Sequence, residues 1–147
     1  MLHIRQRADA WGRLGPPKSK AGSRDIPLVP MAVNALRQWR LACPAGDLGL
    51  VFPNRHGRVQ TIQNLRERVL LPLQRSCGIT AQYGFHALRH AAASLFIAYL
   101  GWTPKRVQTV MGHASITMTY DRYGHLFADT ESDRKAMERL EAAVLTA

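Results

Sequence analysis

Residues 85–127 have the sequence FHALRHAAASLFIAYLGWTPKRVQTVMGHASITMTYDRYGHLF, and the rest of the chain is interpreted outward from them. This stretch holds four of the six histidines and three of the four tyrosines, but no acidic residue before Asp121. Imidazole, guanidinium and phenol groups suit chemistry on an anion, with a hydroxyl available to attack it. Because metals that handle phosphates usually bind to carboxylates, the pattern predicts a phosphoryl-transfer site that uses cationic side chains in place of a metal. The side chains concerned are His86, Arg89, His90, Lys105, Arg106, His113, Tyr120, Arg122, Tyr123 and His125.

The same stretch predicts three helices. Residues 85–100 are mainly apolar and rich in alanine, so this helix should lie deep in the domain. Thr103 and then Pro104 supply an N-cap and a first-turn proline for a second helix, which Gly112 ends. A third, short helix is expected over residues 115–123.

The N-terminal part predicts a small β-hairpin. Residues 2–8 alternate weakly between apolar and polar and form the first strand, and residues 25–30 form the returning strand. Residues 9–25 between them are rich in glycine, proline and basic residues, with too little apolar content for an element of their own. We therefore expect a long turn there.

Two further helices are expected between the hairpin and the central stretch. Pro30 opens the first, and residues 49–54 after it form a short buried strand or extended segment. Thr61 caps the second helix, Pro72 kinks or divides it, and Gly78 ends it. The apolar faces consist of Met31, Ala35, Leu36 and Trp39 in the first helix and Ile62, Leu65, Val69 and Leu73 in the second.

These elements predict a mainly α fold with a small β-hairpin, of the α+β class. The 147 residues are enough for one domain with a substantial core. Its parts would be the hairpin (1–29), a helical body (30–127) and a tail helix (128–147). Asp129 and Thr130 introduce the tail helix, whose narrow apolar stripe consists of Met137, Leu140 and Val144.

Charge indicates the kind of partner. The 20 basic and 10 acidic residues give a net charge of +10, and the tail from residue 129 onward is mildly acidic. A basic body suits a polyanion, most often nucleic acid, although a high isoelectric point also occurs without specific meaning. No apolar run approaches the ~20 residues of a membrane span, and the charged N-terminus is unlike a signal peptide. Cys43 and Cys77 form neither a disulfide framework nor a metal-type spacing, so we expect a reducing cytoplasm and no membrane partner.

Three sequence boxes resemble those of one protein family. PPKSKAGSRDIPL at residues 16–28 looks like a lysine-bearing β-hairpin with its return strand. HALRH at 86–90 and MGHASITMTYDRYGHLF at 111–127 follow in order. Together they resemble the catalytic domain of the tyrosine recombinase (phage integrase) family over nearly the whole chain.

The resemblance implies a role for each of five side chains. Tyr123 would be the nucleophile that attacks the scissile DNA phosphate and forms a 3′-phosphotyrosyl link. Arg89 would hold the non-bridging oxygens, which its planar fork suits, and His113 would hydrogen-bond the phosphate. His86 would give acid–base and hydrogen-bonding support, and Lys18 would protonate the leaving 5′-oxygen.

Other basic residues would assist these five. His90, one helical turn after His86, would be a supporting member of the site. Lys20, Arg24 and Arg13 are either DNA phosphate contacts or part of a solvated basic turn.

Two of these assignments have a competitor nearby in the sequence. Tyr120 lies three residues before Tyr123, but the D-R-Y-G-H context favours Tyr123 as the nucleophile. Lys20 competes with Lys18, and the small hydroxyl residue next to Lys18, together with its distance from the Ile-Pro pair, favours Lys18.

For Arg89, His113 and His86, structural or metal-binding roles remain as alternatives. Arg89 would otherwise form a structural salt bridge, and His113, which follows Gly112, would otherwise cap a helix. His86 and His90 have the spacing of zinc ligands, but Ala, Leu and Arg stand between them, and the arginine would repel a metal.

The resemblance implies site-specific recombination or integration of double-stranded DNA without a cofactor. The full-length enzyme would be a homo-oligomer, a tetramer on DNA, with the tail stripe packed either on its own domain or on a neighbouring subunit. Family members also carry a catalytic arginine before the hairpin, whereas Arg5 and Arg7 here fall on the first hairpin strand. We therefore expect an N-terminally truncated catalytic domain with little or no activity of its own. The alternatives are a recombinase-derived DNA-binding module without catalysis and a metal-dependent histidine phosphatase or nuclease.

Overall fold

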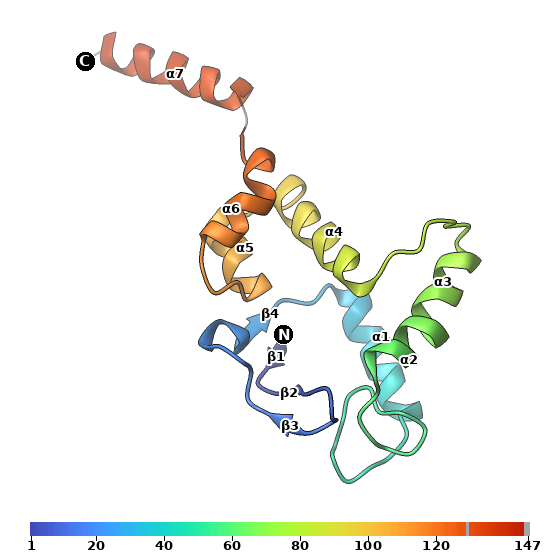
Figure 1. The fold of residues 1–147 in the computed structure, drawn as a ribbon. Coiled ribbons are helices and arrows are strands. Elements are labelled where there is room, and N and C mark those ends of the chain that lie inside the picture. The colour runs from blue at the N-terminus through green and yellow to red at the C-terminus, as the bar shows by residue number, and fades with distance from the viewer. Residues whose placement is uncertain (129, 146–147) are drawn as a thin grey trace.

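Three helices meet around the core of the fold (Figure 1). The computed structural model describes residues 1–128 and 130–145. In it α4 (Phe85–Ala98), α5 (Pro104–Met111) and α6 (Thr117–Tyr123) occupy the three places that the sequence predicts. The buried core cluster consists of Ala93, Ile97, Val107, Met111 and Tyr123, with Ala92, Phe96, Trp102 and Phe127 packed against it.

Only one face of α4 is buried, so the prediction that this helix lies deep in the domain is wrong. Ala93 and Ile97 are buried, one turn apart, and face the core cluster. Leu88 and Leu95 on the same helix are each about half exposed, at 51% and 52%. The high apolar content of this helix therefore does not mean that it is fully buried. Its buried residues pack into the core cluster on one side of the helix, and other apolar side chains of the helix are exposed.

The N-terminal region contains two short strand pairs instead of one long hairpin. β1 (Leu2–Ile4) pairs antiparallel with β4 (Arg24–Ile26), with Leu2 opposite Ile26. Between them, β2 (Arg7–Ala8) pairs with β3 (Leu14–Gly15), and the 3₁₀ turn η1 (Lys20–Gly22) precedes β4. The predicted pairing of a first strand with a returning strand is therefore confirmed, whereas the prediction that residues 9–25 contain no element of their own is wrong.

A local polar motif explains the second strand pair. The Asp9 carboxylate accepts hydrogen bonds from the backbone N–H groups of Trp11 at 2.8 Å and Arg13 at 2.9 Å. Gly12 between them has φ +78°, a conformation that favours glycine. This hairpin is therefore closed by side-chain hydrogen bonds to the backbone of its turn. A prediction based on apolar content does not detect such bonds.

Helix α1 (Pro30–Ala42) starts at Pro30 as predicted, but its inner face differs. Leu36 and Trp39 are partly buried, whereas Met31 is 78% exposed. The Trp39 indole donates from Nε1 to the Val51 carbonyl at 2.6 Å. The short strand or extended segment predicted over residues 49–54 is reduced to one isolated bridge between Pro53 and Val59. Val51 and Phe52 lie in a bend and are both more than half exposed.

The next helical stretch is divided where the sequence predicts. The Thr61 hydroxyl caps α2 (Ile62–Leu65) by accepting from the Asn64 N–H at 3.2 Å. A π-helical turn, η2 (Arg66–Leu70), then leads into α3 (Leu71–Ser76), which has Pro72 in its first turn. Proline has no N–H to continue an α-helical ladder, so the stretch changes its hydrogen-bonding pattern just before it.

The C-terminal helix projects away from the rest of the molecule (Figure 1). After the 3₁₀ turn η3 (Gly124–Leu126), α7 (Thr130–Leu145) confirms the predicted tail helix over its described length. Asp129, the predicted start of that helix, and residues 146–147 lie outside the described residues. Within the described parts of the chain, no helix is both long enough and apolar enough to cross a membrane.

Candidate active site

A cleft of about 330 Å³ lies between α4, α6 and the turn that follows α5. A water molecule occupies about 30 Å³ of liquid, so the cleft has room for a phosphate group and its ester oxygens. Five side chains nominated from the sequence line it together, while Lys18, Lys20, Arg13 and Arg24 are not among its lining residues. The cleft is lined by His86, Arg89, His90, Gly112, His113, Met118, Asp121, Arg122 and Tyr123.

Helix α4 contributes three cationic or titratable groups from one face. His86, Arg89 and His90 stand three and four residues apart, a spacing that places side chains side by side on a helix. The two imidazole rings meet edge to face, with centroids 4.6 Å apart. Three adjacent groups of this kind on one helical turn present a surface suited to an anion.

The Arg89 guanidinium crosses the cleft and donates from Nη2 to the Met111 carbonyl at the end of α5. Among residues 1–128 and 130–145, no acidic side chain forms a salt bridge with it. This contact holds one of the five N–H groups and fixes the plane of the guanidinium. The salt-bridge alternative for Arg89 therefore finds no partner in the described part of the chain.

The turn after α5 has a geometry that requires glycine. Gly112 adopts φ +69°, and a Cβ there would lie 2.8 Å from the Ala21 carbonyl oxygen and 2.9 Å from Nη1 of Arg24. The N–H of His113 donates to the Gln108 carbonyl at 3.1 Å, which closes the helix end in the Schellman pattern. The backbone of His113 thus takes part in the helix cap while its side chain is free to enter the cleft.

The His113 ring is held by a buried hydroxyl. Its Nδ1 lies 2.9 Å from Oγ1 of Thr119, which is fully buried on α6. Burial, followed by the positive charges of Arg89 and Arg122, lowers the pKa of His113 below its ordinary value. A mostly neutral imidazole in a fixed orientation can present Nε2 to a ligand in the cleft.

Tyr123 places its hydroxyl against His90. The Tyr123 Oη lies 2.7 Å from Nδ1 of His90, and the tyrosine side chain is only 4% exposed. Burial raises the pKa of the Tyr123 phenol, although Arg89 and Arg122 act in the opposite direction. Tyr120, the competing candidate, is 51% exposed, packs against Phe127 and does not line the cleft.

Arg122, which lines the cleft, and Thr119, which supports it, were not assigned a role from the sequence. Arg122 lies beside the His90 ring, with Nη1 3.5 Å from Nε2, and its position directly before Tyr123 was the available signal. Thr119 holds His113, and its position four residues before Tyr123 puts both on the same helix face. Both residues can be recognised once the register of α6 is known.

Arg24 points into the fold. Its Nε donates to the Val110 carbonyl at 2.8 Å and its Nη1 to the Gly22 carbonyl at 2.9 Å. Burial, followed by the charge of Arg89, lowers the pKa of the Arg24 guanidinium. These contacts fasten β4 to the end of α5, so most of the guanidinium is engaged by the protein itself.

Lys18 and Lys20 lie in residues 16–23, here named the hairpin loop. Both lysines and the nearby Arg13 are exposed. Within the described residues, neither lysine ammonium forms a hydrogen bond or an ion pair. The hairpin loop therefore offers solvated cations outside the cleft.

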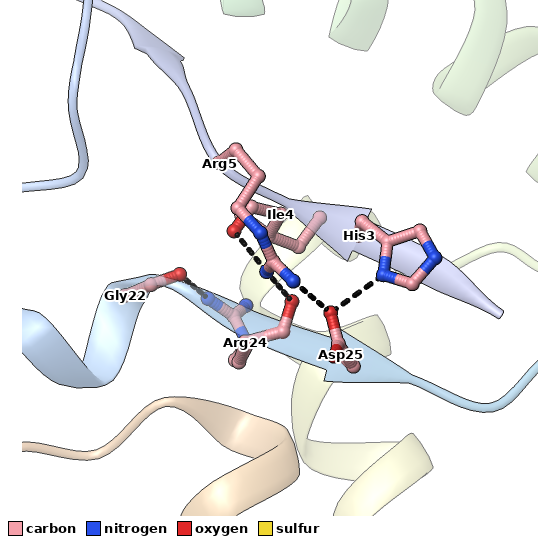
Figure 2. Close-up of polar contacts among 6 residues, drawn as sticks. All are labelled: His3, Ile4, Arg5, Gly22, Arg24 and Asp25. Atoms are coloured by element: carbon pink, nitrogen blue, oxygen red, sulfur yellow. Dashed lines mark hydrogen bonds and ion pairs between the residues drawn. The ribbon is translucent and has the colours of Figure 1, made fainter.

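The early arginines belong to the strand pair. Arg5 donates from Nη2 to the Asp25 carboxylate at 2.5 Å and from Nη1 to the Arg24 carbonyl at 3.0 Å (Figure 2). His3 contacts the same carboxylate oxygen of Asp25 at 2.7 Å. Contacts with His3 and Arg5 lower the pKa of the exposed Asp25. Arg5 thus lies on the hairpin as its sequence position predicts, and it does not line the cleft.

The arrangement suits attack on a phosphate by a phenol. A tyrosine hydroxyl with an adjacent imidazole stands beside Arg89, Arg122 and His113, which can donate to phosphate oxygens. No group of three or more histidine, cysteine, aspartate or glutamate side chains within residues 1–128 and 130–145 is arranged to hold a metal ion. Apart from the carboxylate of Asp121, the chemistry available from the side chains of the cleft is nucleophilic and cationic.

Comparison with known proteins gives consistent similarities. Residues 13–129 match the model of the phage integrase family. The tyrosine recombinase XerC of Xylella fastidiosa (strain M23) is 35% identical over 107 residues, which cover 71% of this chain and 35% of the relative. The transposase from transposon Tn916 of Enterococcus faecalis is 28% identical over 143 residues, covering 84% of this chain and 33% of that protein.

A solved structure shares the fold. The Tn1549 transposon integrase, in complex with transposon right end DNA, superposes with a TM-score of 0.67 at 25% identity. The superposition covers 95% of this chain and 48% of that one. The chain therefore spans about a third of the length of the curated relatives and about half of the solved structure.

Proposed function

The chain belongs to the phage integrase family, and from this premise we propose that its cleft cleaves and rejoins DNA strands in site-specific recombination. The single observation that carries the proposal is the Tyr123 hydroxyl in a cleft with His113 and with Arg89, which forms no salt bridge with an acidic side chain in the described part of the chain. The proposal takes residues 1–147 as one catalytic domain.

The proposed reaction uses no metal and no nucleotide cofactor. Tyr123 Oη attacks the scissile phosphorus and passes its proton to a histidine of the cleft, a bond between Oη and phosphorus forms, and the bond from phosphorus to O5′ breaks. Arg89 and His113 hold the non-bridging oxygens, where negative charge grows in the transition state. Lys18 gives a proton to the leaving O5′. The covalent 3′-phosphotyrosyl link retains the bond energy, so the reverse reaction rejoins strands.

The proposed substrate is double-stranded DNA, and the similar Tn1549 transposon integrase has been solved in complex with transposon right end DNA and with a circular intermediate DNA. The net charge of +10 and the solvated cations Lys18, Lys20 and Arg13 support a polyanion partner. His86, which is exposed and lines the cleft, is the residue to which the family resemblance assigns acid–base and hydrogen-bonding support. We further propose assembly as a homo-oligomer, a tetramer on DNA, in the complete protein.

The projecting tail helix supports assembly between subunits. Met137, Leu140 and Val144 on α7 are each more than half exposed. An apolar stripe on a helix that extends from the body (Figure 1) is suited to a second subunit. If this stripe packed on its own domain instead, the three side chains would be buried against that domain.

The test of this function is covalent trapping. The chain is incubated with a pool of nicked duplexes of random sequence, in which the nick lets the cleaved 5′ fragment diffuse away, and adducts are separated on denaturing gels. We expect a small amount of adduct, insensitive to chelators and lost in Tyr123→Phe. The yield should be low because the family resemblance implies two catalytic arginines, and Arg89 is the one assigned in the described cleft.

Other outcomes separate the alternatives. Salt-sensitive DNA binding without any adduct would support the second candidate, a recombinase-derived DNA-binding module. An adduct that persists in Tyr123→Phe, or activity that a chelator abolishes, would contradict the proposed chemistry.

A further inference from the structure

We infer that His90, and not His86, is the general base that takes the proton from the Tyr123 hydroxyl and later returns it. This assignment rests on the proposed function and names a further catalytic residue in the same cleft. The family resemblance gave the acid–base role to His86 and only a supporting role to His90.

The geometry distinguishes the two histidines. Nδ1 of His90 lies 2.7 Å from Tyr123 Oη, which is the length of a good hydrogen bond to the reacting atom. His86 touches the His90 ring edge to face, with centroids 4.6 Å apart, and no contact with Tyr123 is formed by it among the described residues. His86 is also exposed, whereas His90 is partly buried next to the core residue Tyr123.

The base role requires the tautomer with the proton on Nε2, since Nδ1 must accept from the phenol. Nε2 of His90 lies 3.5 Å from Nη1 of Arg122, the upper limit for a hydrogen bond. That contact favours the opposite tautomer only weakly. Nδ1 of His90 is therefore available to Tyr123.

The surroundings of His90 favour its neutral form, which is the form that can accept a proton. Burial, followed by His86, Arg122 and Arg89, lowers the pKa of His90, so the ring is neutral at pH 7. His113 lines the same cleft from the turn after α5, and the charge of His90 lowers the pKa of His113. No acidic residue among the described ones pairs with the ring and competes for Nδ1.

The proton is accounted for at each step. As the bond between Tyr123 Oη and phosphorus forms, the phenolic proton moves to Nδ1 of His90. The bond from phosphorus to O5′ breaks, and O5′ takes a proton from Lys18. In rejoining, O5′ attacks phosphorus and gives its proton back to Lys18, the bond to Tyr123 Oη breaks, and His90 returns its proton to that oxygen.

The test uses an alkyl fluorophosphonate as a probe, because it needs neither DNA nor a protonated leaving group. Attack by Tyr123 Oη on the probe phosphorus releases fluoride and passes the phenolic proton to His90. Labelling of each tyrosine is followed by mass spectrometry from pH 5 to 9. Tyr99, which is 81% exposed, is the internal reference for an unactivated phenol.

The expected result is faster labelling of Tyr123 than of Tyr99, with a decline at acidic pH as His90 becomes protonated, which the lowered pKa of His90 places below the range of an ordinary histidine. His90→Asn keeps a polar group near the position of Nδ1 but cannot take the proton. It should slow Tyr123 labelling on the order of 10²-fold and remove the acidic decline. His56→Asn, at an exposed position that does not line the cleft, is the matched control and should behave as the unchanged chain.

Three results would overturn the inference. They are labelling of Tyr123 no faster than Tyr99, the same rate and pH profile in His90→Asn, or an acidic decline that disappears in His86→Asn instead. Each is independent of DNA trapping. A chain that forms no DNA adduct but shows His90-dependent labelling would contradict the proposed function and leave the base assignment in place.

Discussion

The cleft and the hairpin loop both carry cationic side chains, but they hold them differently. In the cleft, Arg89, His90 and His113 each contact a group on another element, namely Met111, Tyr123 and Thr119. In the hairpin loop, the ammonium groups of Lys18 and Lys20 are exposed and form no ion pair within the described residues. The nucleophile is thus positioned by the protein alone, whereas the group proposed for the leaving oxygen has no fixed partner before DNA binds.

The largest expected effect is in the cleft. Arg89→Lys replaces a planar fork by a point charge and loses both the Met111 contact and bidentate binding of phosphate. The rate of adduct formation should fall on the order of 10²–10³-fold. Quench-flow or manual time courses on a nicked duplex measure it.

The control for that variant is Arg40→Lys, at an exposed position of α1. It should leave the adduct rate unchanged within about twofold, since surface substitutions rarely matter. Equal losses in both variants would mean that general charge, and not the cleft geometry, determines the rate.

The next effect tests the hairpin loop. Lys18→Ala should slow cleavage of an ordinary phosphodiester on the order of 10²-fold, because the leaving O5′ lacks its proton donor. A duplex with sulfur in place of that oxygen needs no donor, so the same variant should cleave it at nearly the unchanged rate. Lys20→Ala is the matched variant and should show no such difference between the substrates.

If Lys20→Ala shows the sulfur rescue and Lys18→Ala does not, the two lysines exchange roles. If neither shows it, the hairpin loop has no part in the departure of O5′. The contribution of the hairpin loop, unlike that of the cleft, would then be limited to DNA binding.

A smaller effect tests how the cleft is held. Thr119→Val keeps the buried shape but removes the hydroxyl 2.9 Å from Nδ1 of His113. The adduct rate should fall about tenfold, the equivalent of roughly 1.4 kcal/mol for a lost hydrogen bond. Thr119→Ser restores the hydroxyl and should restore the rate, and a Ser variant as slow as Val would point to packing instead.

The smallest effect concerns phosphate contacts outside the cleft. Arg13→Ala and Lys20→Ala should each weaken DNA binding a few-fold and reduce the salt slope of log K by about 1. Fluorescence anisotropy at several salt concentrations measures this. An unchanged slope in both variants would assign these residues to a solvated turn.

Much of the cleft scaffold could be predicted because it depends on local signals. The Thr103 hydroxyl accepts from the Arg106 N–H, and Pro104 occupies the first turn, so α5 starts where its cap lies. Gly112 ends α5 because only glycine fits its φ and the close approach of Ala21. His86, Arg89, His113 and Tyr123 could be named from the boxes that carry the family resemblance.

Contacts between distant segments could not be predicted in the same way. His86 and His90 share one helix face, and the choice of partner for Tyr123 depends on how α6 crosses α4. Arg24 lies in a basic loop sequence, yet its donors bind carbonyls because β4 packs on the end of α5. Patterns in a single sequence indicate helix periodicity and helix caps. They do not indicate how elements that are distant in the sequence pack on one another.

The most direct test of the central claim is to locate the covalent bond. Trapped adducts are digested with nuclease and protease, and the nucleotide-bearing peptide is sequenced by tandem mass spectrometry. The account predicts a nucleotide 3′-phosphate on Tyr123 and none on Tyr120. A nucleotide on Tyr120, or on any residue outside the cleft, would contradict it.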